Sequence, residues 1–133
     1  MKNPFIDLFA GCGGLSLGLE QAGFQPVYVN ELNTDALNTY LVNRSEYKHL
    51  SLKEFHSKDI RELSGSKKNL EELSKNLKSK FNIKKGDLSL VVGGPPCQGY
   101  SGIGHRRSYK VDKEKIPSNY LYKEMYKVIE HFN

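Results

Sequence analysis

A short apolar run that ends in paired glycines and paired prolines constrains this chain more than any other feature. Residues 88–92, Leu-Ser-Leu-Val-Val, have the composition of a buried strand. Gly93-Gly94-Pro95-Pro96 follow, and each proline fixes its own φ and restricts the residue before it. The stiffened loop delivers Cys97 to the edge of the sheet where open α/β folds bind ligands. We therefore interpret Cys97 as a reactive thiol; a buried, inert cysteine is the alternative.

A second glycine-rich segment follows the first predicted strand. Residues 4–9 are largely apolar, residues 10–14 read Ala-Gly-Cys-Gly-Gly, and residues 15–22 predict a short helix that stops at Gly23. Such a turn lets the backbone approach a ligand closely and points free amide groups at it. Ser16 stands where the dinucleotide fingerprint needs its third glycine. We therefore expect a cofactor with an adenosine but no pyrophosphate; a plain tight turn is the alternative.

Acidic residues follow the next two predicted strands. Residues 27–30 predict a strand that ends at Glu31, where an acidic side chain can accept hydrogen bonds from ribose hydroxyls. A solvated carboxylate at a strand end is the alternative. Residues 58–60, Lys-Asp-Ile, are predicted to close a third strand, which puts Asp59 in the same row as Glu31. Taken alone, Asp59 is equally well explained as the cap of a turn.

The remaining segments predict helices. Asn33 or Thr34 caps a helix over residues 35–42, and an amphipathic helix with a solvated basic face runs to Phe81. Ser118 or Asn119 is predicted to cap the last helix, whose apolar stripe we expect to be core: Leu121, Tyr122, Met125, Val128, Ile129 and Phe132. The alternation of strands and helices predicts an α/β fold with a doubly wound, mostly parallel sheet.

Composition limits the function classes without choosing among them. The chain has 133 residues, enough for one domain, and its net charge of +5 is compatible with a polyanionic partner but does not establish one. Two cysteines without a Cys/His cluster favour neither a metal site nor a disulfide scaffold. With no apolar segment long enough for a membrane and no signal-peptide pattern, we expect a reduced, cytosolic protein.

Two motifs together resemble the cytosine carbon-5 DNA methyltransferases. Residues 7–14, Asp-Leu-Phe-Ala-Gly-Cys-Gly-Gly, with Gly18, resemble the first motif of that family, and residues 93–101 resemble its catalytic motif. Asn30-Glu31 and residues 58–60 fall where its second and third motifs belong. The resemblance covers residues 1–133, which then look like the N-terminal part of a catalytic, cofactor-binding domain with the Rossmann-like fold of S-adenosylmethionine-dependent methyltransferases.

The resemblance implies a cofactor, a substrate and a role for each motif. S-adenosyl-L-methionine would lie over the glycine turn, with Phe9 on the adenine, Glu31 on the ribose and Asp59 at the adenine amino group. Cys97 would add to carbon-6 of a cytosine flipped out of double-stranded DNA, and carbon-5 would take the methyl group. The implied cofactor-binding residues are Phe9, Ala10, Gly11, Cys12, Gly13, Gly14, Leu15, Asn30, Glu31, Asp59, Ile60, Gly93 and Pro95. The implied substrate-binding residues are Gln98, Ser101, Arg106 and Arg107, and no metal is implied.

The sequence also departs from the family. It ends at Asn133, before the Glu-Asn-Val strand, the Gln-Arg-x-Arg motif, the target-recognition domain and the final helix that the family pattern continues into. We therefore expect a truncated piece, the first half of a split enzyme with a C-terminal companion polypeptide, or the product of a broken gene. Weak or absent activity on its own, and self-association through the exposed face, are expected.

Rival functions stay open at this point. A transfer-RNA cytosine methyltransferase keeps the lineage and changes the substrate, and a cofactor-binding or partner-binding remnant would be non-enzymatic. A nicotinamide-dependent oxidoreductase is a further rival, against which Ser16 and the Pro-Pro-Cys-Gln loop both count. If the resemblance holds, the chain acts in restriction-modification in the bacterial cytosol, beside the nucleoid.

Overall fold

The structure, a computed structural model, describes residues 1–97 and 117–133. Within these ranges four strands form one parallel sheet in the order β3-β2-β1-β4. The strands are β1 (Pro4–Leu8), β2 (Gln25–Asn30), β3 (His56–Ser57) and β4 (Leu90–Gly93). The first strand of the chain therefore lies inside the sheet, between β2 and β4.

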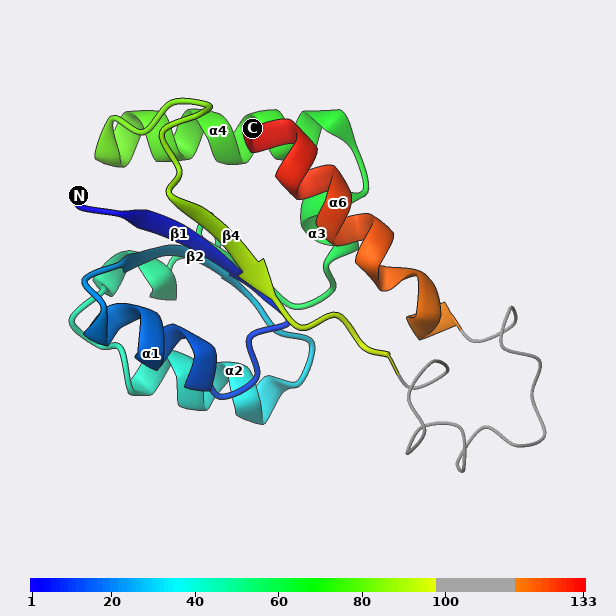
Figure 1. Ribbon diagram of the computed structural model, residues 1–133, viewed down its shortest axis with the longest axis horizontal. Helices are drawn as coiled ribbons and strands as arrows, with labels where there is room; N and C mark the ends of the chain where they lie inside the picture. Colours follow the sequence, from blue (N-terminus) through cyan, green and yellow to red (C-terminus); the bar gives the residue numbers. More distant parts are fainter. Residues whose placement is uncertain (98–116) are drawn as a thin grey trace.

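Helices cover both faces of this sheet, as Figure 1 shows. On one face lie α1 (Gly14–Gln21) and α2 (Thr34–Val42); on the other lie α3 (Arg61–Ser64), α4 (Lys67–Phe81) and α6 (Leu121–Phe132). Two short 3₁₀ helices also occur in the described ranges: η1 (Lys48–Ser51) and η3 (Pro117–Tyr120). The predicted α/β fold with a doubly wound, parallel sheet is confirmed.

The alternation of side chains along β1 divides the interior into two cores. All five residues of β1 are buried. Ile6 and Leu8 belong to the larger core under α4 and α6, whereas Asp7 faces α1 and contacts Ser16. The larger core also contains the predicted apolar stripe of α4, since Leu70, Leu73 and Leu77 are all buried. Burial of these apolar side chains is the main force that holds the helices on this face.

The helix ends follow from local sequence. α1 ends at Gln21 with Ala22 as its C-cap, and Gly23, which follows, has a left-handed φ of 88°. The N–H groups of Gly23 and Phe24 return to the carbonyls of Glu20 and Leu19. Asn33, one of the two predicted caps of α2, accepts a hydrogen bond from the N–H of Ala36. The predicted stop at Gly23 and the cap at Asn33 are therefore both confirmed.

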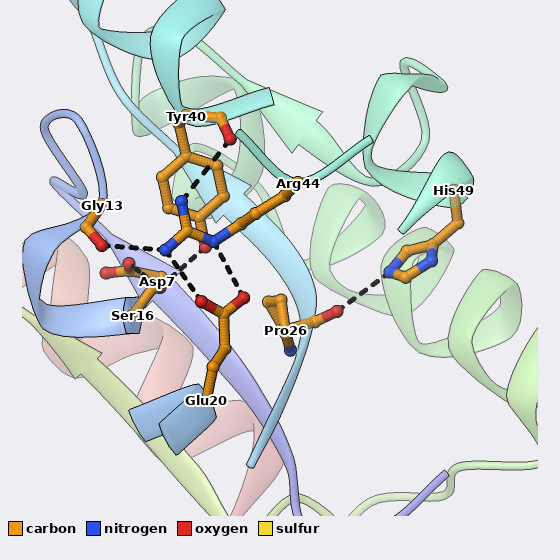
Figure 2. Close-up of polar contacts among 8 residues, drawn as sticks. All are labelled: Asp7, Gly13, Ser16, Glu20, Pro26, Tyr40, Arg44 and His49. Atoms are coloured by element: carbon orange, nitrogen blue, oxygen red, sulfur yellow. Dashed lines mark hydrogen bonds and ion pairs between the residues drawn. The ribbon is translucent and has the colours of Figure 1, made fainter. Parts of the chain in front are cut away.

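A buried histidine covers the part of β2 that β3 does not reach. β3 pairs only with Val29 and Asn30, so the carbonyl of Pro26 has no strand beside it on that side. The Nε2–H of His49 donates to this carbonyl at 2.9 Å, as Figure 2 shows. The ring packs edge-on against Phe55 and Phe81, and this burial lowers the pKa of His49 below its usual range.

The predicted position of the third strand is wrong. The strand is His56–Ser57, and residues 58–60 have left the sheet. The reason is a reciprocal cap: Asp59 accepts a hydrogen bond from the N–H of Arg61, and Glu62 accepts one from the N–H of Asp59. These bonds turn the chain into α3 and leave Asp59 just beyond the strand end.

Two expectations for the last helix are also wrong. Neither Ser118 nor Asn119 caps α6, because residues 117–120 already turn as η3 and the N-cap is Tyr120. The apolar stripe is only partly core: Val128 and Phe132 are buried, but Tyr122 is 49% exposed and Ile129 is 40% exposed. The other strands match their predictions within a few residues at each end.

Two kinds of feature are absent from the described residues. No helix in residues 1–97 and 117–133 is both long and apolar enough to cross a membrane. The same ranges hold no group of three or more His, Cys, Asp or Glu residues that could bind a metal ion.

Removal of one buried methyl-rich side chain tests the larger core. Leu77 is 1% exposed, so Leu77→Ala should lower the free energy of unfolding by roughly 2–5 kcal/mol, through lost transfer energy and the cavity left behind. Leu52 is 44% exposed, and Leu52→Ala should cost less than about 1 kcal/mol. Denaturant titration of both variants measures the difference; equal losses would contradict this assignment of the core.

Candidate active site

Two loops of different origin begin side by side at the carboxyl edge of the sheet. Leu8, the last residue of β1, pairs with Gly93, the last residue of β4. A Cβ atom added to Gly93 would lie 2.4 Å from the carbonyl oxygen of Leu8, so only glycine permits this approach. The glycine turn after β1 and the Pro95-Pro96-Cys97 loop after β4 therefore start from neighbouring points.

A cleft of about 660 Å³ opens at this edge, within the usual size range of ligand pockets. Its walls come from the ends of β1 and β2, from the segment after β3, from the loop after β4 and from the start of α6. The lining residues are Phe9, Asn30, Glu31, Leu32, Asn33, Thr34, Lys58, Asp59, Ile60, Arg61, Gly94, Pro96 and Leu121. The structure thus brings together Phe9, Asn30, Glu31, Asp59 and Ile60 from the predicted cofactor-binding set.

Glu31 joins the end of β2 to the glycine turn. One carboxylate oxygen accepts a hydrogen bond from the N–H of Gly11 at 2.7 Å, and the other accepts one from the N–H of Asn33 at 2.9 Å. An ionised carboxylate has about four acceptor positions in total. Glu31 therefore keeps acceptor capacity while it fixes the turn, and its position in the cleft wall makes that capacity available to a ligand.

Phe9 is held in an unusual backbone conformation. Its φ is 55°, in the left-handed region that residues other than glycine rarely adopt. Asn30, which is 1% exposed, accepts a hydrogen bond from the N–H of Phe9 and donates to Ser57 Oγ and to the carbonyl of Lys58. Asn30 therefore connects the ends of three strands. Its hydrogen bonds hold the left-handed backbone of Phe9, whose conformational strain is on the order of 1 kcal/mol or more.

Asp59 lies in the cleft wall but already has a protein partner. Its two carboxylate oxygens accept hydrogen bonds from Arg61 Nε at 2.9 Å and Arg61 Nη2 at 2.8 Å. These bonds hold the pKa of Asp59 below its usual range. Asp59 therefore both caps α3 and faces the cleft, so the two interpretations of this residue are compatible.

The glycine turn presents open space above its backbone. Gly11 and Gly13 have left-handed φ values of 58° and 92°, and Gly14 begins α1. A Cβ atom at Gly11 or Gly14 would meet no atom within 4 Å. The first-turn amides of α1 have no acceptor within the helix. Cys12, Gly13 and Gly14 line a separate hollow between α1 and α2 rather than the cleft.

The other residues predicted for the site either do not line the cleft or lie outside the residues that the structure describes. Cys97 is exposed, next to a cleft-lining proline, so its side chain does not point into packed interior. Ala10, Gly93 and Pro95 are not among the lining residues of the cleft, and Leu15 is 53% exposed on α1. The predicted substrate-binding residues Gln98, Ser101, Arg106 and Arg107 lie outside the described residues.

Behind the glycine turn lies a buried polar network that sequence reasoning missed (Figure 2). The Ser16 hydroxyl donates to Asp7, and the Tyr40 hydroxyl bonds to Ser16 Oγ at 2.7 Å. The other oxygen of Asp7, which is buried, has no hydrogen-bond partner in the described part of the chain. Burial raises the pKa of Asp7 to about 6, against the opposing effects of Ser16 and Arg44. Ser16 in place of the third glycine was the sequence signal for this network.

Comparison with known proteins identifies the family of this chain. The family model described as C-5 cytosine-specific DNA methylase matches residues 4–133. The chain belongs to this family. The fold at the cleft and the order of the two glycine-containing loops agree with that assignment.

Individual members of the C-5 cytosine methylase family are similar over most of this chain. Type II methyltransferase M.AgeI from Thalassovita gelatinovora is 36% identical over 127 residues, which are 96% of this chain and 25% of that protein. Type II methyltransferase M1.HphI from Haemophilus parahaemolyticus is 34% identical over 131 residues, 98% of this chain and 30% of that protein. The chain thus spans about a quarter to three tenths of the length of these two relatives.

A solved structure supports the same fold. A crystal structure of a protein described as a DNA modification methyltransferase, encoded within a prophage of E. coli, superposes with a TM-score of 0.58 and 29% sequence identity. The match covers 97% of this chain and 29% of the other. The methylase chain therefore has the methyltransferase type of Rossmann-like fold, as predicted.

The raised pKa of Asp7 makes the stability of this methylase chain depend on pH. Folded Asp7 binds its proton more tightly than the unfolded residue does, so its contribution to stability falls as pH rises from about 4 to about 6. Asp7→Asn removes this titration. The unfolding free energy of the variant, relative to the unchanged chain, should therefore rise by about 2 kcal/mol between pH 4 and pH 7.

Urea titrations at both pH values measure that difference, and Asp35→Asn on the exposed start of α2 is the matched control. A difference that stays flat with pH would contradict the raised pKa of Asp7.

Proposed function

We propose that this C-5 cytosine methylase chain supplies the cofactor-binding cleft and the nucleophile of a DNA (cytosine-5-)-methyltransferase. The pairing of Leu8 with Gly93 carries the proposal, because it starts the glycine turn and the Cys97 loop from neighbouring strand ends. The cleft between them has walls from both motifs. Since the chain spans only part of its relatives, the activity, substrate and partners of the whole protein all belong to this proposal.

The described residues fit S-adenosyl-L-methionine. Open space at Gly11 and Gly14 permits close approach of a ligand to the backbone. The ring of Phe9 would pack on the adenine, the carboxylate of Glu31 would accept the ribose hydroxyls, and Asp59 would meet the adenine amino group. Ile60 and the remaining predicted residues of the glycine turn, with Gly93 and Pro95, would complete the site. Asn30 would act through the position of Phe9, because its amide group is already bonded.

Cys97 would perform covalent catalysis on a flipped cytosine. Its thiolate forms a bond to carbon-6, and the electron pair of the carbon-5–carbon-6 double bond moves to carbon-5. S-adenosylmethionine, when bound, would supply the methyl group that carbon-5 takes, and the carbon–sulfur bond of its sulfonium would break to leave a thioether. A base then takes the proton of carbon-5, the double bond re-forms, and the Cys97 thiolate is released.

Double-stranded DNA is the substrate we favour over transfer RNA. A further relative, at 35% identity over 123 residues, carries the name DNA (cytosine-5)-methyltransferase PliMCI and comes from Paracentrotus lividus. The substrate contacts proposed for Gln98, Ser101, Arg106 and Arg107 rest on the motif resemblance alone. Because the two type II relatives come from bacteria, the place that we propose for the protein is the bacterial cytoplasm, beside the nucleoid.

A companion polypeptide would dock at the edge of β4. In the described part of the chain β4 pairs only with β1, and a hollow lined by Leu88, Leu90, Val91 and Ile129 lies beside it. An unpaired edge next to apolar side chains is suited to strand addition. A C-terminal polypeptide that begins with a strand is the first proposed occupant, and a second copy of this chain is the other. Chromatography of the chain alone and with such a polypeptide separates the two.

Cofactor binding tests the first half of the proposal. Glu31→Gln removes the charge that would hold the ribose, so the Kd for S-adenosylmethionine should rise about 10–100-fold. Glu54→Gln makes the same change of charge at an exposed site outside the cleft and should leave the Kd unchanged. Calorimetry with S-adenosylmethionine and with NAD measures both; binding of NAD in place of S-adenosylmethionine would refute the cofactor assignment.

An assay of methyl transfer tests the second part of the proposal, the role of Cys97 as the nucleophile. With labelled cofactor and cytosine-containing DNA, the chain alone should transfer little or no label, and a companion polypeptide should restore transfer. Cys97→Ser should abolish the restored transfer while the Kd for the cofactor changes less than about threefold, since this residue would contact cytosine. Robust transfer by the chain alone would overturn the need for a companion, and full transfer by Cys97→Ser would overturn the nucleophile.

A further inference from the structure

The residue that fixes the glycine turn lies outside the cleft, just after the end of α2. Arg44, the second residue after the end of this helix, is 4% exposed. Its Nη2 donates to the carbonyl of Gly13 at 2.8 Å, and its guanidinium carbon lies 4.0 Å from the centre of the Tyr40 ring. Figure 2 shows the guanidinium between the glycine turn, α1 and the Tyr40 ring.

A carboxylate of α1 holds the guanidinium in place. Glu20 accepts hydrogen bonds from Arg44 Nε and Nη2, both at 2.9 Å, in the two-point geometry that a planar guanidinium favours. The Nη1 group of Arg44 also approaches the carbonyl of Tyr40, at 3.5 Å. The guanidinium therefore has little freedom, and its bond to Gly13 has a fixed direction.

The turn itself is shaped around this side chain. Gly13 has a φ of 92°, and a Cβ atom there would lie 2.4 Å from Arg44 Nη1 and 2.7 Å from the Tyr40 ring. Glycine is thus required at this position for its backbone conformation and for the space that Arg44 occupies. The neighbouring Gly14 has no such contact, because its Cβ position is open.

The bond to Gly13 sets the direction of the amide that would face a ligand. The carbonyl of Gly13 accepts from Leu17 N and from Arg44, so it points into α1. Across a planar trans peptide the carbonyl and the following N–H point in opposite directions. The N–H of Gly14 therefore points away from the body of α1, out of its N-terminus.

We propose that Arg44, paired with Glu20, is a positioning residue that sets the affinity of the glycine turn for the cofactor without touching it. This inference rests on the proposed binding of S-adenosylmethionine. Arg44 lines the hollow between α1 and α2 and is not among the lining residues of the cleft. Its effect on binding passes through the peptide between Gly13 and Gly14.

Arg44→Lys is the informative change, because lysine keeps the charge beside Glu20 but cannot bond Glu20 and Gly13 through one planar group. We expect the Kd for S-adenosylhomocysteine to rise about tenfold. Glu20→Gln keeps the Arg44 side chain but weakens the contact that orients its guanidinium, so the Kd for S-adenosylhomocysteine should rise about threefold. Leu77→Ala, in the other core, should lower the melting temperature at least as much and leave the Kd of the folded chain unchanged.

A cofactor-free measurement separates this inference from the proposed function. The backbone couplings of Gly13, measured by NMR in the chain without ligand, report its φ. Arg44→Lys should move them away from the left-handed value, and Leu77→Ala should not. If the unchanged chain fails to bind S-adenosylhomocysteine, the proposed function fails while the couplings still decide the role of Arg44. Unmoved couplings, or a Kd for Arg44→Lys equal to that of the unchanged chain, would overturn the positioning role.

Discussion

The close contact between the backbone of Gly93 and the carbonyl of Leu8 is the constraint on which the rest of the site depends. A side chain at position 93 has no room, so the two strand ends approach as closely as parallel pairing permits. Two loops with different chemistry then leave the sheet from one place. The part of the cleft wall at Gly94 and Pro96 and the position of the exposed Cys97 follow from this approach, whereas the acidic wall at Glu31 follows from the pairing of β2 on the other side of β1.

Polar groups on the opposite face of β1 hold the same turn from behind. Asp7, Ser16 and Tyr40 join the strand to both helices of that face, and the ion pair of Arg44 with Glu20 lies beside them. Such a network is costly to bury unless its members are satisfied, and one oxygen of Asp7 has no partner in the described part of the chain. Burial of this polar network therefore lowers the stability of the methylase chain. The same network shapes the part of the backbone that would contact the cofactor.

Sequence predicted the parts of this structure that local rules determine. The glycine at 23, the asparagine cap at 33 and the leucine stripe of α4 were readable because turn geometry and helical period leave few alternatives. The third strand was misplaced because the reciprocal cap between Asp59 and Glu62 outweighed the strand pattern. The role of Arg44 could not be predicted, because its partners Glu20 and Gly13 are distant in the sequence and no spacing pattern indicates a buried arginine. Of the site, the cleft residues Phe9, Glu31 and Asp59 were predictable, and their present partners were not.

The place of β1 in the sheet also has a consequence for biosynthesis. Among the four described strands this one is synthesised first, both of its neighbours in the sheet come later, and β4 comes last. β2 can pair with one edge of β1 soon after synthesis, but the other edge of this apolar strand stays open until β4 emerges, and pairing of such distant segments is slow. Completion of the sheet around β1 therefore waits for the same strand that leads into the Pro95-Pro96-Cys97 loop.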